Sequence, residues 1–493
     1  MIATPFSTTR FSACFLALIL VPLAIHLHTA PAHAAEKNIR FPETAAGRIA
    51  EEWLRAFNSG DAEVMGRFNL EHDSESLLER MDDARRRNMY LGVFVQTGPI
   101  TPERIVREAP DGIDILCRSE SGDWLEVEIG LEAETGKISR VMLKPSAPPG
   151  DQPPEGPLSE REALDGIAEK LVESTRSDEF AGSVLIARDG GEIFAESFGM
   201  ASREFSVPNS IDTKFNLGSI NKIFTKTAVA LLLSEGKLSL DDRIADSLPD
   251  YPNREVAEKV TVRHLVDMSS GIGDFFGERY VAMPKSQLRT LEDYLPLFAG
   301  DPLRFEPGTG ELYSNGGFVV LGLIVASASG EDYYDYVRRR IFAPAGMSDT
   351  DSYEADEIVP NLACGYTRTS FEEKQGALRA NIFTRPARGS SAGGGYSTVH
   401  DLLKFVNAIR TNALLPPEYS AWIFGGPEPG AAREGDGGRE PGGIALAGGA
   451  PGINSFLDIG KPGGYTIIVM TNLDPPSAMR AGRLIRGWLE KIE

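Results

Sequence analysis

Histidine and cysteine are scarce in this chain, with 6 and 3 copies among its 493 residues. Neither recurs at a metal-binding spacing such as H-E-x-x-H or a pair of C-x-x-C motifs. The sequence therefore predicts no metal site, and we expect no cofactor. Cys117 and Cys364 lie in regions that we assign below to different domains, so two buried thiols are a better expectation than a disulfide.

Positive charge is also in short supply. The chain has 50 Lys and Arg against 71 Asp and Glu, a formal net charge of −21. No basic run offsets that balance, which argues against nucleic-acid partners and against anionic membrane surfaces. The 42% of hydrophobic and 25% of charged residues are typical of a soluble protein with a large core. A chain of this length predicts two or three domains.

An apolar run near the N-terminus, Phe11 to Leu27, is short for a membrane span and contains Pro22. Arg10 precedes it, and Ala32-His33-Ala34 follows with the small-x-small pattern of a cleavage site. We therefore interpret residues 1–35 as a signal peptide. The mature protein is expected to be periplasmic or secreted, with no stable membrane span after the signal is removed. An uncleaved membrane anchor is the alternative.

Helical and strand patterns follow one another in residues 36–145. Apolar residues recur at helical spacing from Ala45 to Phe57, and Asn58-Ser59-Gly60 ends that run. Alternating apolar residues then predict three strands, around 113–117, 125–129 and 138–143. Helices followed by antiparallel strands predict a small α+β domain.

This region also contains a short motif, W-x-x-x-F-N-S-G-D, at Trp53–Asp61. With the order of elements, it resembles the cone-shaped nuclear-transport-factor-like fold. That resemblance implies a structural, binding or dimerising role, so a homodimer is one expectation. Some such cones catalyse with a His–Asp pair, for which His72 and Asp73 are the candidates here. An ordinary solvated loop is the alternative for these two residues.

Residues 146–157 are rich in Pro and Gly and predict a semi-rigid linker between domains. Directly beyond the linker, Ser159 and Glu162 form a capping-box pattern. This pattern predicts a helix that runs to about Thr175.

The remaining signals predict the core of a second domain. Asp189-Gly190-Gly191 between two apolar segments is a hairpin signal. A buried strand at 466–471 and a helix at 480–489 close the chain. We therefore expect residues 158–493 to form an α+β domain, in which an antiparallel sheet is built from both ends of the domain and covered by helices.

Ser219 and Lys222 precede an apolar-periodic run, Ile223 to Leu233, that stops at Gly236 and predicts a helix. Three residues apart, they would share one face of its first turn. A Ser hydroxyl becomes a nucleophile when a nearby group takes its proton, and a Lys can do so when burial or a helix N-terminus lowers its pKa. Free backbone N–H groups at that terminus can stabilise an oxyanion. This pattern indicates an acylating serine enzyme.

Tyr313-Ser314-Asn315 supplies a second set of functional groups. A Tyr beside a Lys can exchange protons with a substrate, and an Asn amide can bind both a substrate carbonyl and the Lys. The flanking Gly310 and Gly316-Gly317 suit a backbone that packs against a cleft. Similar patterns at Ser234–Lys237 and Tyr251–Asn253 lie at a predicted helix end and in a predicted loop, so we do not assign them a function.

Six blocks in order make residues 158–493 resemble the superfamily of penicillin-binding proteins and class C β-lactamases. The blocks are Phe215–Thr225, His264–Ile272, Tyr313–Asn315, Gly346–Thr350, Ala392–Thr398 and Gly448–Ser455. The resemblance implies a β-lactamase/transpeptidase-like domain with an antiparallel sheet, flanking helices and a helical subdomain. Members are serine hydrolases that act on β-lactams, esters or D-amino-acid peptides through an acyl-enzyme.

The resemblance also implies residue roles. Ser219 would be the nucleophile, Lys222 its proton acceptor or orienter, and Tyr313 the base and acid of the two half-reactions. Asn315 would bind the substrate carbonyl. His264 and the Gly393–Gly395 run are interpreted as structural.

The family's third motif, Lys-Thr-Gly or His-x-Gly, falls on Leu446-Ala447-Gly448 and departs from the pattern. Leu446 cannot donate a hydrogen bond to a substrate carboxylate or tune the phenol of Tyr313. This departure argues against carboxylate-bearing β-lactams as substrates. The backbone N–H of Gly449 could still complete an oxyanion hole with that of Ser219, because backbone donors do not depend on the side chain.

These observations predict an exported serine hydrolase that acts through an acyl-enzyme on ester, amide or peptide bonds. Its partner would be a small-molecule or peptide substrate. The alternative is a catalytically impaired binding or scaffolding protein that retains the β-lactamase fold. Leu446 and the additional N-terminal domain favour that alternative.

Overall fold

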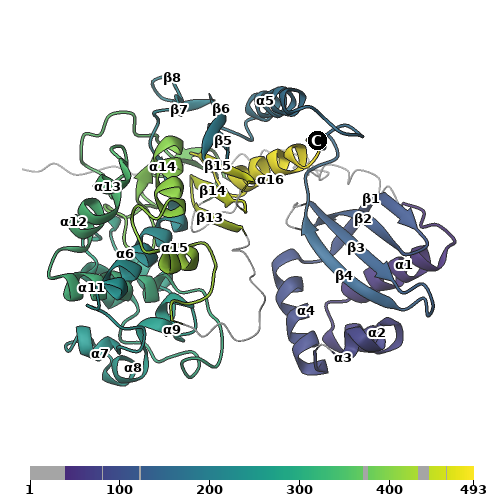
Figure 1. Cartoon of the computed structure of the whole chain (residues 1–493), viewed down its shortest axis with the longest axis horizontal. Helices are drawn as coiled ribbons and strands as arrows, with labels where there is room; N and C mark the ends of the chain where they lie inside the picture. The colour runs from purple at the N-terminus through teal and green to yellow at the C-terminus, as the bar shows by residue number, and fades with distance from the viewer. Residues whose placement is uncertain (1–38, 80, 121–123, 370–375, 431–442, 462) are drawn as a thin grey trace, which may run out of the picture. The chain divides into compact units, whose positions relative to one another are not determined.

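The structure is a computed structural model that describes residues 39–493 apart from 80, 121–123, 370–375, 431–442 and 462. The described residues form two compact units, which divide between Lys144 and Pro145 (Figure 1). The predicted signal peptide lies outside the described residues. Among the residues that are described, no helix is both long and apolar enough to cross a membrane.

Among the described residues of the first unit, four helices precede four strands. They are α1 (Ala45–Phe57), α2 (Ala62–His72), α3 (Glu75–Glu79), α4 (Asp83–Thr97), β1 (Ile100–Ala109), β2 (Gly112–Ser119), β3 (Trp124–Leu131) and β4 (Ile138–Pro145). Thr44 and Asp61 cap α1 and α2 by accepting hydrogen bonds from backbone N–H groups. The strands form one sheet in sequence order, and buried side chains of β2 and β3 pack with Trp53 and Phe57 of α1. The likeness to a cone-shaped fold stays a prediction.

Strand β1 was not predicted from the sequence. It lies at the edge of the sheet, carries Pro102 and pairs with β2 through two register shifts. Edge strands with bulges and exposed polar residues lack the regular alternation that identifies a strand. Helix α4 continues to Thr97, close to the start of β1.

The second unit is built on a five-stranded antiparallel sheet of order β13-β14-β15-β5-β6. The strands are β5 (Gly182–Arg188), β6 (Gly191–Phe198), β13 (Ile444–Ala450), β14 (Ile453–Ile459) and β15 (Tyr465–Thr471). The predicted hairpin and closing strand are confirmed, and the sheet does combine both ends of the unit. Asp189 and Gly190 have positive φ angles at the hairpin turn, as such a turn requires.

Helices cover both faces of this sheet. Helices α5 (Glu160–Arg176) and α16 (Ser477–Leu489) pack on one face, where Val184 and Ile186 of β5 point. Leu185 and Ala187, which alternate with them along the strand, belong to the larger core on the other face. This alternation follows from the two-residue period of a strand. The predicted linker is not free along its whole length, because Trp488 of α16 donates a hydrogen bond to the carbonyl of Asp151.

A helical subdomain fills the other face. Its helices are α6 (Lys222–Ser234), α7 (Ile244–Ser247), α8 (Arg254–Lys259), α9 (Val262–Val266), α10 (Glu278–Ala282), α11 (Asn315–Ser329), α12 (Tyr333–Val337), α13 (Ala343–Ala345), α14 (Val399–Arg410) and α15 (Pro417–Ile423). Helix α6 is apolar on nearly every side and lies at the centre of the core, where α11 packs against it. The packing of these two helices brings the predicted catalytic motifs together.

Short strand pairs complete the unit. They are β7 (Met200–Ser202) with β8 (Val207–Pro208), β9 (Phe215–Asn216) with β12 (Tyr396–Ser397), and β10 (Tyr366–Thr367) with β11 (Arg379–Ala380). The β9–β12 pair connects the segment before Ser219 to the glycine-rich run.

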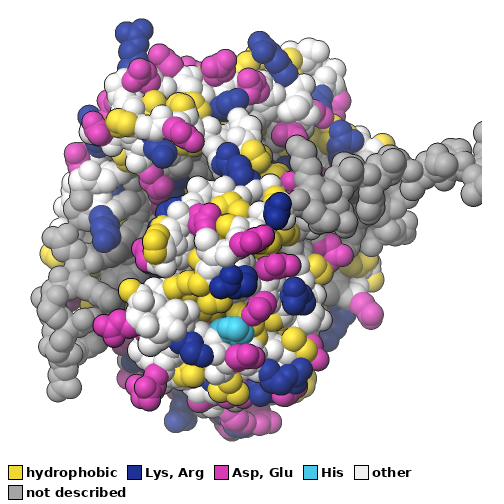
Figure 2. All heavy atoms as spheres, turned by 90° about the vertical axis from the view of Figure 1, so that its right-hand side faces the viewer, with side chains coloured by type: hydrophobic (Ala, Val, Ile, Leu, Met, Phe, Trp, Pro, Cys, Tyr) yellow, Lys and Arg dark blue, Asp and Glu magenta, His cyan; other side chains and the backbone are white. Residues whose placement is uncertain are grey.

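Figure 2 shows one face of the molecule, on which acidic and basic side chains are interspersed rather than segregated.

Candidate active site

Ser219 lies on a tight turn between β9 and α6. The turn, Gly218–Asn221, is a 3₁₀ helix, and the α-helix begins at Lys222 rather than at Ser219. Gly218 has a φ of 50°, which favours glycine, and its N–H donates to Asn216 Oδ1 at 2.9 Å. Ser219 and Lys222 still meet, because residues i and i+3 eclipse one another in a 3₁₀ turn.

The hydroxyl of Ser219 contacts both predicted proton-transfer groups. Its Oγ lies 3.1 Å from Lys222 Nζ and 2.6 Å from the phenol oxygen of Tyr313. Tyr313 ends the loop before α11, and Ser314 caps that helix by accepting a hydrogen bond from the Gly317 N–H at 2.8 Å. The middle residue of the Tyr-Ser-Asn motif is therefore structural, while its neighbours reach the site.

Lys222 is only 8% exposed. Its Nζ donates to Asn315 Oδ1 at 2.6 Å and to the carbonyl of Ala392. Burial lowers its pKa to about 7, and the Asp274 carboxylate opposes that effect. A Lys with such a pKa is uncharged in a large share of molecules at neutral pH and can accept the proton of Ser219.

Tyr313 has the opposite character. Although its surface is half-exposed, desolvation of the phenol raises its pKa, which the hydrogen bond to Ser219 lowers and Asp274 raises further. Its hydroxyl donates to Ser219 in this geometry. A phenol that keeps its proton at neutral pH suits a proton donor. Of the two candidates for the first proton acceptor, the opposite pKa shifts of the two groups favour Lys222.

Two groups near Lys222 were not predicted from the sequence to belong to the site. Asp274 Oδ2 accepts a hydrogen bond from Asn315 Nδ2 at 2.7 Å, and the Ala392 carbonyl accepts one from Lys222. Asp274 follows the block that ends at Ile272, but no spacing rule connected it to a Lys far back in the chain. A backbone carbonyl carries no side-chain signal at all. The Asn315 amide nitrogen has a second N–H, which leaves a donor for the contact with a substrate carbonyl that remains a prediction.

Strand β13 passes close to the turn that holds Ser219. A Cβ added to Gly448 would lie 2.0 Å from the Leu217 carbonyl oxygen and 2.9 Å from Ser219 N. One added to Gly218 would lie 2.8 Å from Gly449 N. Only glycine permits such an approach. It places the backbone nitrogens of Ser219 and Gly449 on adjacent segments, as an oxyanion hole requires.

Leu446 lies two residues before Gly448 on β13 and is half-buried against the main core. Residues two apart on a strand share a face, so this side chain faces the helical subdomain as Gly448 does. It contributes apolar contacts there and no hydrogen-bond donor.

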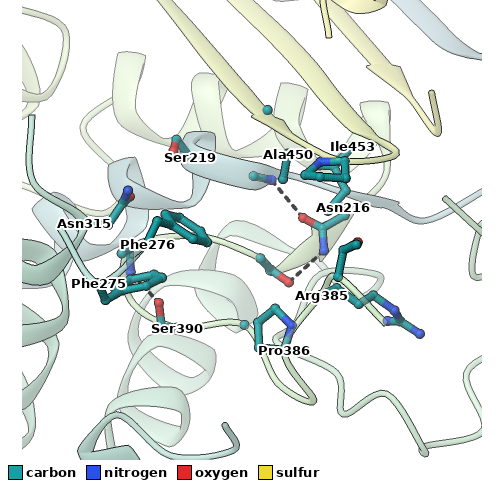
Figure 3. A pocket seen from close by; sticks show the side chains of 18 of the residues that line it. Asn216, Ser219, Phe275, Phe276, Asn315, Arg385, Pro386, Ser390, Ala450 and Ile453 are labelled. Carbon is teal, nitrogen blue, oxygen red and sulfur yellow. Dashed lines mark hydrogen bonds between the residues drawn. The ribbon is translucent and has the colours of Figure 1, made fainter. Parts of the chain in front are cut away.

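A pocket opens beside Ser219 (Figure 3). Asn216, Gly449 and the predicted glycine turn are among its lining residues. In that turn, Gly394 has a φ of 97°, its N–H donates to the Gly218 carbonyl at 3.3 Å, and its carbonyl accepts from Asn216 Nδ2 at 3.1 Å. The glycine-rich run is thus a tight turn that supports the segment before Ser219.

The similar patterns at Ser234–Lys237 and Tyr251–Asn253, to which no function was assigned, have structural roles. Tyr251 is buried in the core, and Asn253 caps α8. Ser234 donates to the Leu231 carbonyl at the end of α6, and Lys237 pairs with Glu235. None of these four polar residues is among the described residues that line the pocket.

Other chemically reactive residues lie outside this site. His72 stacks on Phe68 with ring centroids 4.4 Å apart, and burial raises the pKa of Asp73 to about 6. Cys117 is a buried free thiol whose pKa burial raises to about 12, and Cys364 is a half-buried free thiol. In the described part of the chain, no three His, Cys, Asp or Glu side chains gather into a metal-binding group.

Known proteins are similar to this unit in sequence and in fold. Penicillin-binding protein 4* of Bacillus subtilis is 32% identical over 213 residues, which span 42% of this chain and 46% of that protein, about half its length. Esterase EstB of Burkholderia gladioli is 29% identical over 283 residues, 52% of this chain and 71% of that protein.

Two solved structures are also similar. A penicillin binding protein from Bacillus halodurans has a TM-score of 0.55 and 29% identity, covering 64% of this chain and 98% of its own. The D-amino acid amidase from Ochrobactrum anthropi SV3 has a TM-score of 0.54 and 25% identity. The match covers 66% of this chain and 98% of the amidase chain. The Beta-lactamase family itself matches residues 165–489. A buried Lys and a Tyr phenol converge on Ser219 within the matched region. The chain belongs to the Beta-lactamase family of serine hydrolases.

Proposed function

We propose that this protein cleaves ester, amide or peptide bonds through an acyl-enzyme on Ser219. The observation that carries the proposal is the position of Ser219 Oγ, within hydrogen-bond distance of a buried Lys and of a Tyr phenol. Similarity to proteins named as an esterase, an amidase and penicillin-binding proteins supports the same class of reaction.

Acylation follows from these contacts. Uncharged Lys222 takes the Ser219 proton as Oγ bonds to the substrate carbonyl carbon. The carbonyl oxygen becomes an oxyanion, which the N–H groups of Ser219 and Gly449 stabilise. When the bond to the leaving group breaks, that group takes a proton from Tyr313, which recovers one from Lys222.

Deacylation uses the same groups in reverse. Water attacks the acyl carbon and gives one proton to the Tyr313–Lys222 pair. The bond to Ser219 Oγ then breaks, the pair returns the proton to Oγ, and the carboxylic acid leaves. Asn315 would hold the substrate carbonyl through its second N–H while its oxygen positions Lys222.

Leu446 narrows the range of substrates. Because it offers no cation or donor where the third motif would supply one, β-lactams with a carboxylate on the leaving side are disfavoured. Esters and small amides do not need that contact. We therefore place esterase-like activity ahead of β-lactam hydrolysis.

Leu446 also motivates a second candidate, a binding or scaffolding protein that retains the fold and has lost turnover. In that case Ser219 would acylate slowly or hold its acyl group without release. The N-terminal unit, with its predicted cone-like fold, would then supply a binding or dimerising surface.

We also propose export to the periplasm or beyond, on the basis of residues 1–35. The mass of the mature protein recovered from the host's periplasm or culture medium tests this proposal. A chain that begins after the Ala32-His33-Ala34 site agrees with it, and a full-length cytoplasmic chain contradicts it.

Intact-mass spectrometry with a fluorophosphonate probe and an activated ester tests the catalytic proposal. Ser219→Ala removes the proposed nucleophile, and Ser234→Ala, at the end of the helix that follows Ser219, is the matched control. An adduct and ester turnover in the parent and in Ser234→Ala, but not in Ser219→Ala, support the hydrolase. An adduct without turnover supports the impaired protein, and equal hydrolysis by Ser219→Ala refutes Ser219 as the nucleophile.

A further inference from the structure

One wall of the pocket beside Ser219 is aromatic. The ring centroids of Phe275 and Phe276 are 4.4 Å apart, those of Phe275 and Tyr294 4.9 Å, and those of Phe276 and Tyr280 4.8 Å. The hydroxyls of Tyr280 and Tyr294 donate to backbone carbonyls at 3.2 and 3.0 Å, which fixes their rings. Phe276 is nevertheless 54% exposed. A fixed aromatic wall that ends in an exposed ring is typical of a site for an apolar ligand.

The charge of the pocket contrasts with that of the chain. Although the protein has a net charge of −21, no Asp or Glu is among the described residues that line the pocket, and Arg385 is its charged lining residue. Arg385 donates to the Tyr396 hydroxyl at 2.7 Å, and Tyr396 is itself 5% exposed. One of five guanidinium N–H donors is used in this bond, and the planar fork of Arg suits a carboxylate. In Figure 3, Ser219 and Asn315 lie at one end of the pocket and Arg385 at the other.

The position of Tyr313 indicates which part of a substrate enters this pocket. Tyr313 reaches Ser219 Oγ but is not among the described lining residues. Since Tyr313 protonates the leaving group in the proposed mechanism, the leaving group departs on its side. The acyl group therefore occupies the pocket, with its carbonyl at Ser219 and its far end toward Arg385.

We propose that this pocket selects acyl groups with an apolar body that end in a carboxylate, which pairs with Arg385. The proposal rests on the proposed hydrolase function and adds the class of substrate. It is compatible with Leu446, because the carboxylate that the third motif would bind belongs to the leaving side, whereas this one belongs to the acyl side. The aromatic wall binds the apolar body, and the guanidinium determines the preferred length.

Half-esters of dicarboxylic acids test the proposal. The probes are 4-nitrophenyl monoesters of adipic, pimelic and suberic acids, each paired with the 4-nitrophenyl ester of the neutral fatty acid of equal chain length. Chains shorter than adipate are avoided, because their own carboxylate attacks the ester. The variants are Arg385→Gln and, as control, Arg379→Gln, which removes an exposed Arg on β11.

In the parent and in Arg379→Gln, kcat/KM for one or more half-esters should exceed that for the neutral partner by about tenfold. In Arg385→Gln, this preference should disappear while hydrolysis of the neutral esters continues, which also shows that the variant is folded. Equal acceptance of charged and neutral esters by the parent, or a preference that survives Arg385→Gln, refutes this inference alone. No turnover of either series, and no Ser219 acylation by intact mass, refutes the proposed hydrolase together with it.

Discussion

Replacement of Asp274 by Asn is expected to move the acid limb of the pH–rate profile to lower pH. Activity in the proposed mechanism requires uncharged Lys222, so it rises with pH through the Lys222 pKa of about 7. The Asp274 carboxylate stabilises the protonated amine and raises that pKa. Its removal therefore lowers the pKa and makes Lys222 a free base at lower pH. Asn keeps an oxygen to accept the hydrogen bond from Asn315.

The size of the effect follows from the contacts through Asn315. Its amide joins Lys222 Nζ and the Asp274 carboxylate by hydrogen bonds of 2.6 and 2.7 Å. Coulomb's law gives about 2 kcal/mol for unit charges roughly 7 Å apart at an effective dielectric constant of about 20. Asp274 is half-exposed, so solvent screening reduces this further. We expect a displacement of the limb by about one pH unit.

The assay is kcat/KM for an activated ester between about pH 5 and pH 9. Asp250→Asn, at an exposed carboxylate, is the matched control and should leave the profile in place. Asp274→Ala, which also removes the hydrogen-bond acceptor, should lower kcat at every pH because Asn315 is no longer held. An acid limb in Asp274→Asn that stays fixed or moves to higher pH would show that Lys222 is not the titrating base.

Two further predictions concern β13. Gly448→Ala should lower the free energy of unfolding by about 2 kcal/mol or more and abolish ester hydrolysis, because its Cβ would lie 2.0 Å from the Leu217 carbonyl oxygen. Thermal unfolding of Gly448→Ala checks this prediction. The control is Gly487→Ala, where an added Cβ meets nothing within 4 Å. Equal stability of the two variants would contradict the prediction. Leu446→His should shorten the lifetime of the acyl-enzyme measured by intact mass, because it restores a donor beside the site. An unchanged lifetime would show that the third motif does not limit deacylation.

Local patterns in the sequence were sufficient for much of the second unit. The capping box of Ser159 and Glu162 begins α5 as predicted, because a cap depends only on residues three apart. The hairpin at Asp189-Gly190 is equally local, since the turn needs residues that tolerate positive φ. Ser219 and Lys222 meet for the same reason, within one helical turn.

Less regular elements were not predicted. Strand β1 has an edge position, a Pro and two register shifts, so its burial pattern carries no clear period of two. The 3₁₀ turn at Gly218–Asn221 packs closely against β13, and a periodic pattern in the sequence does not encode such a contact.

The chemistry of the site was decided by tertiary structure. Motif residues identify Ser219, Lys222 and Tyr313, but the low pKa of Lys222 arises from burial beneath segments distant in sequence. Asp274 and the Ala392 carbonyl act on it only because separate loops pack around α6 and α11. The sequence determined which side chains were available for catalysis. Long-range packing decided which of them are desolvated and adjacent, because desolvation and proximity belong to the folded chain and not to any segment of it.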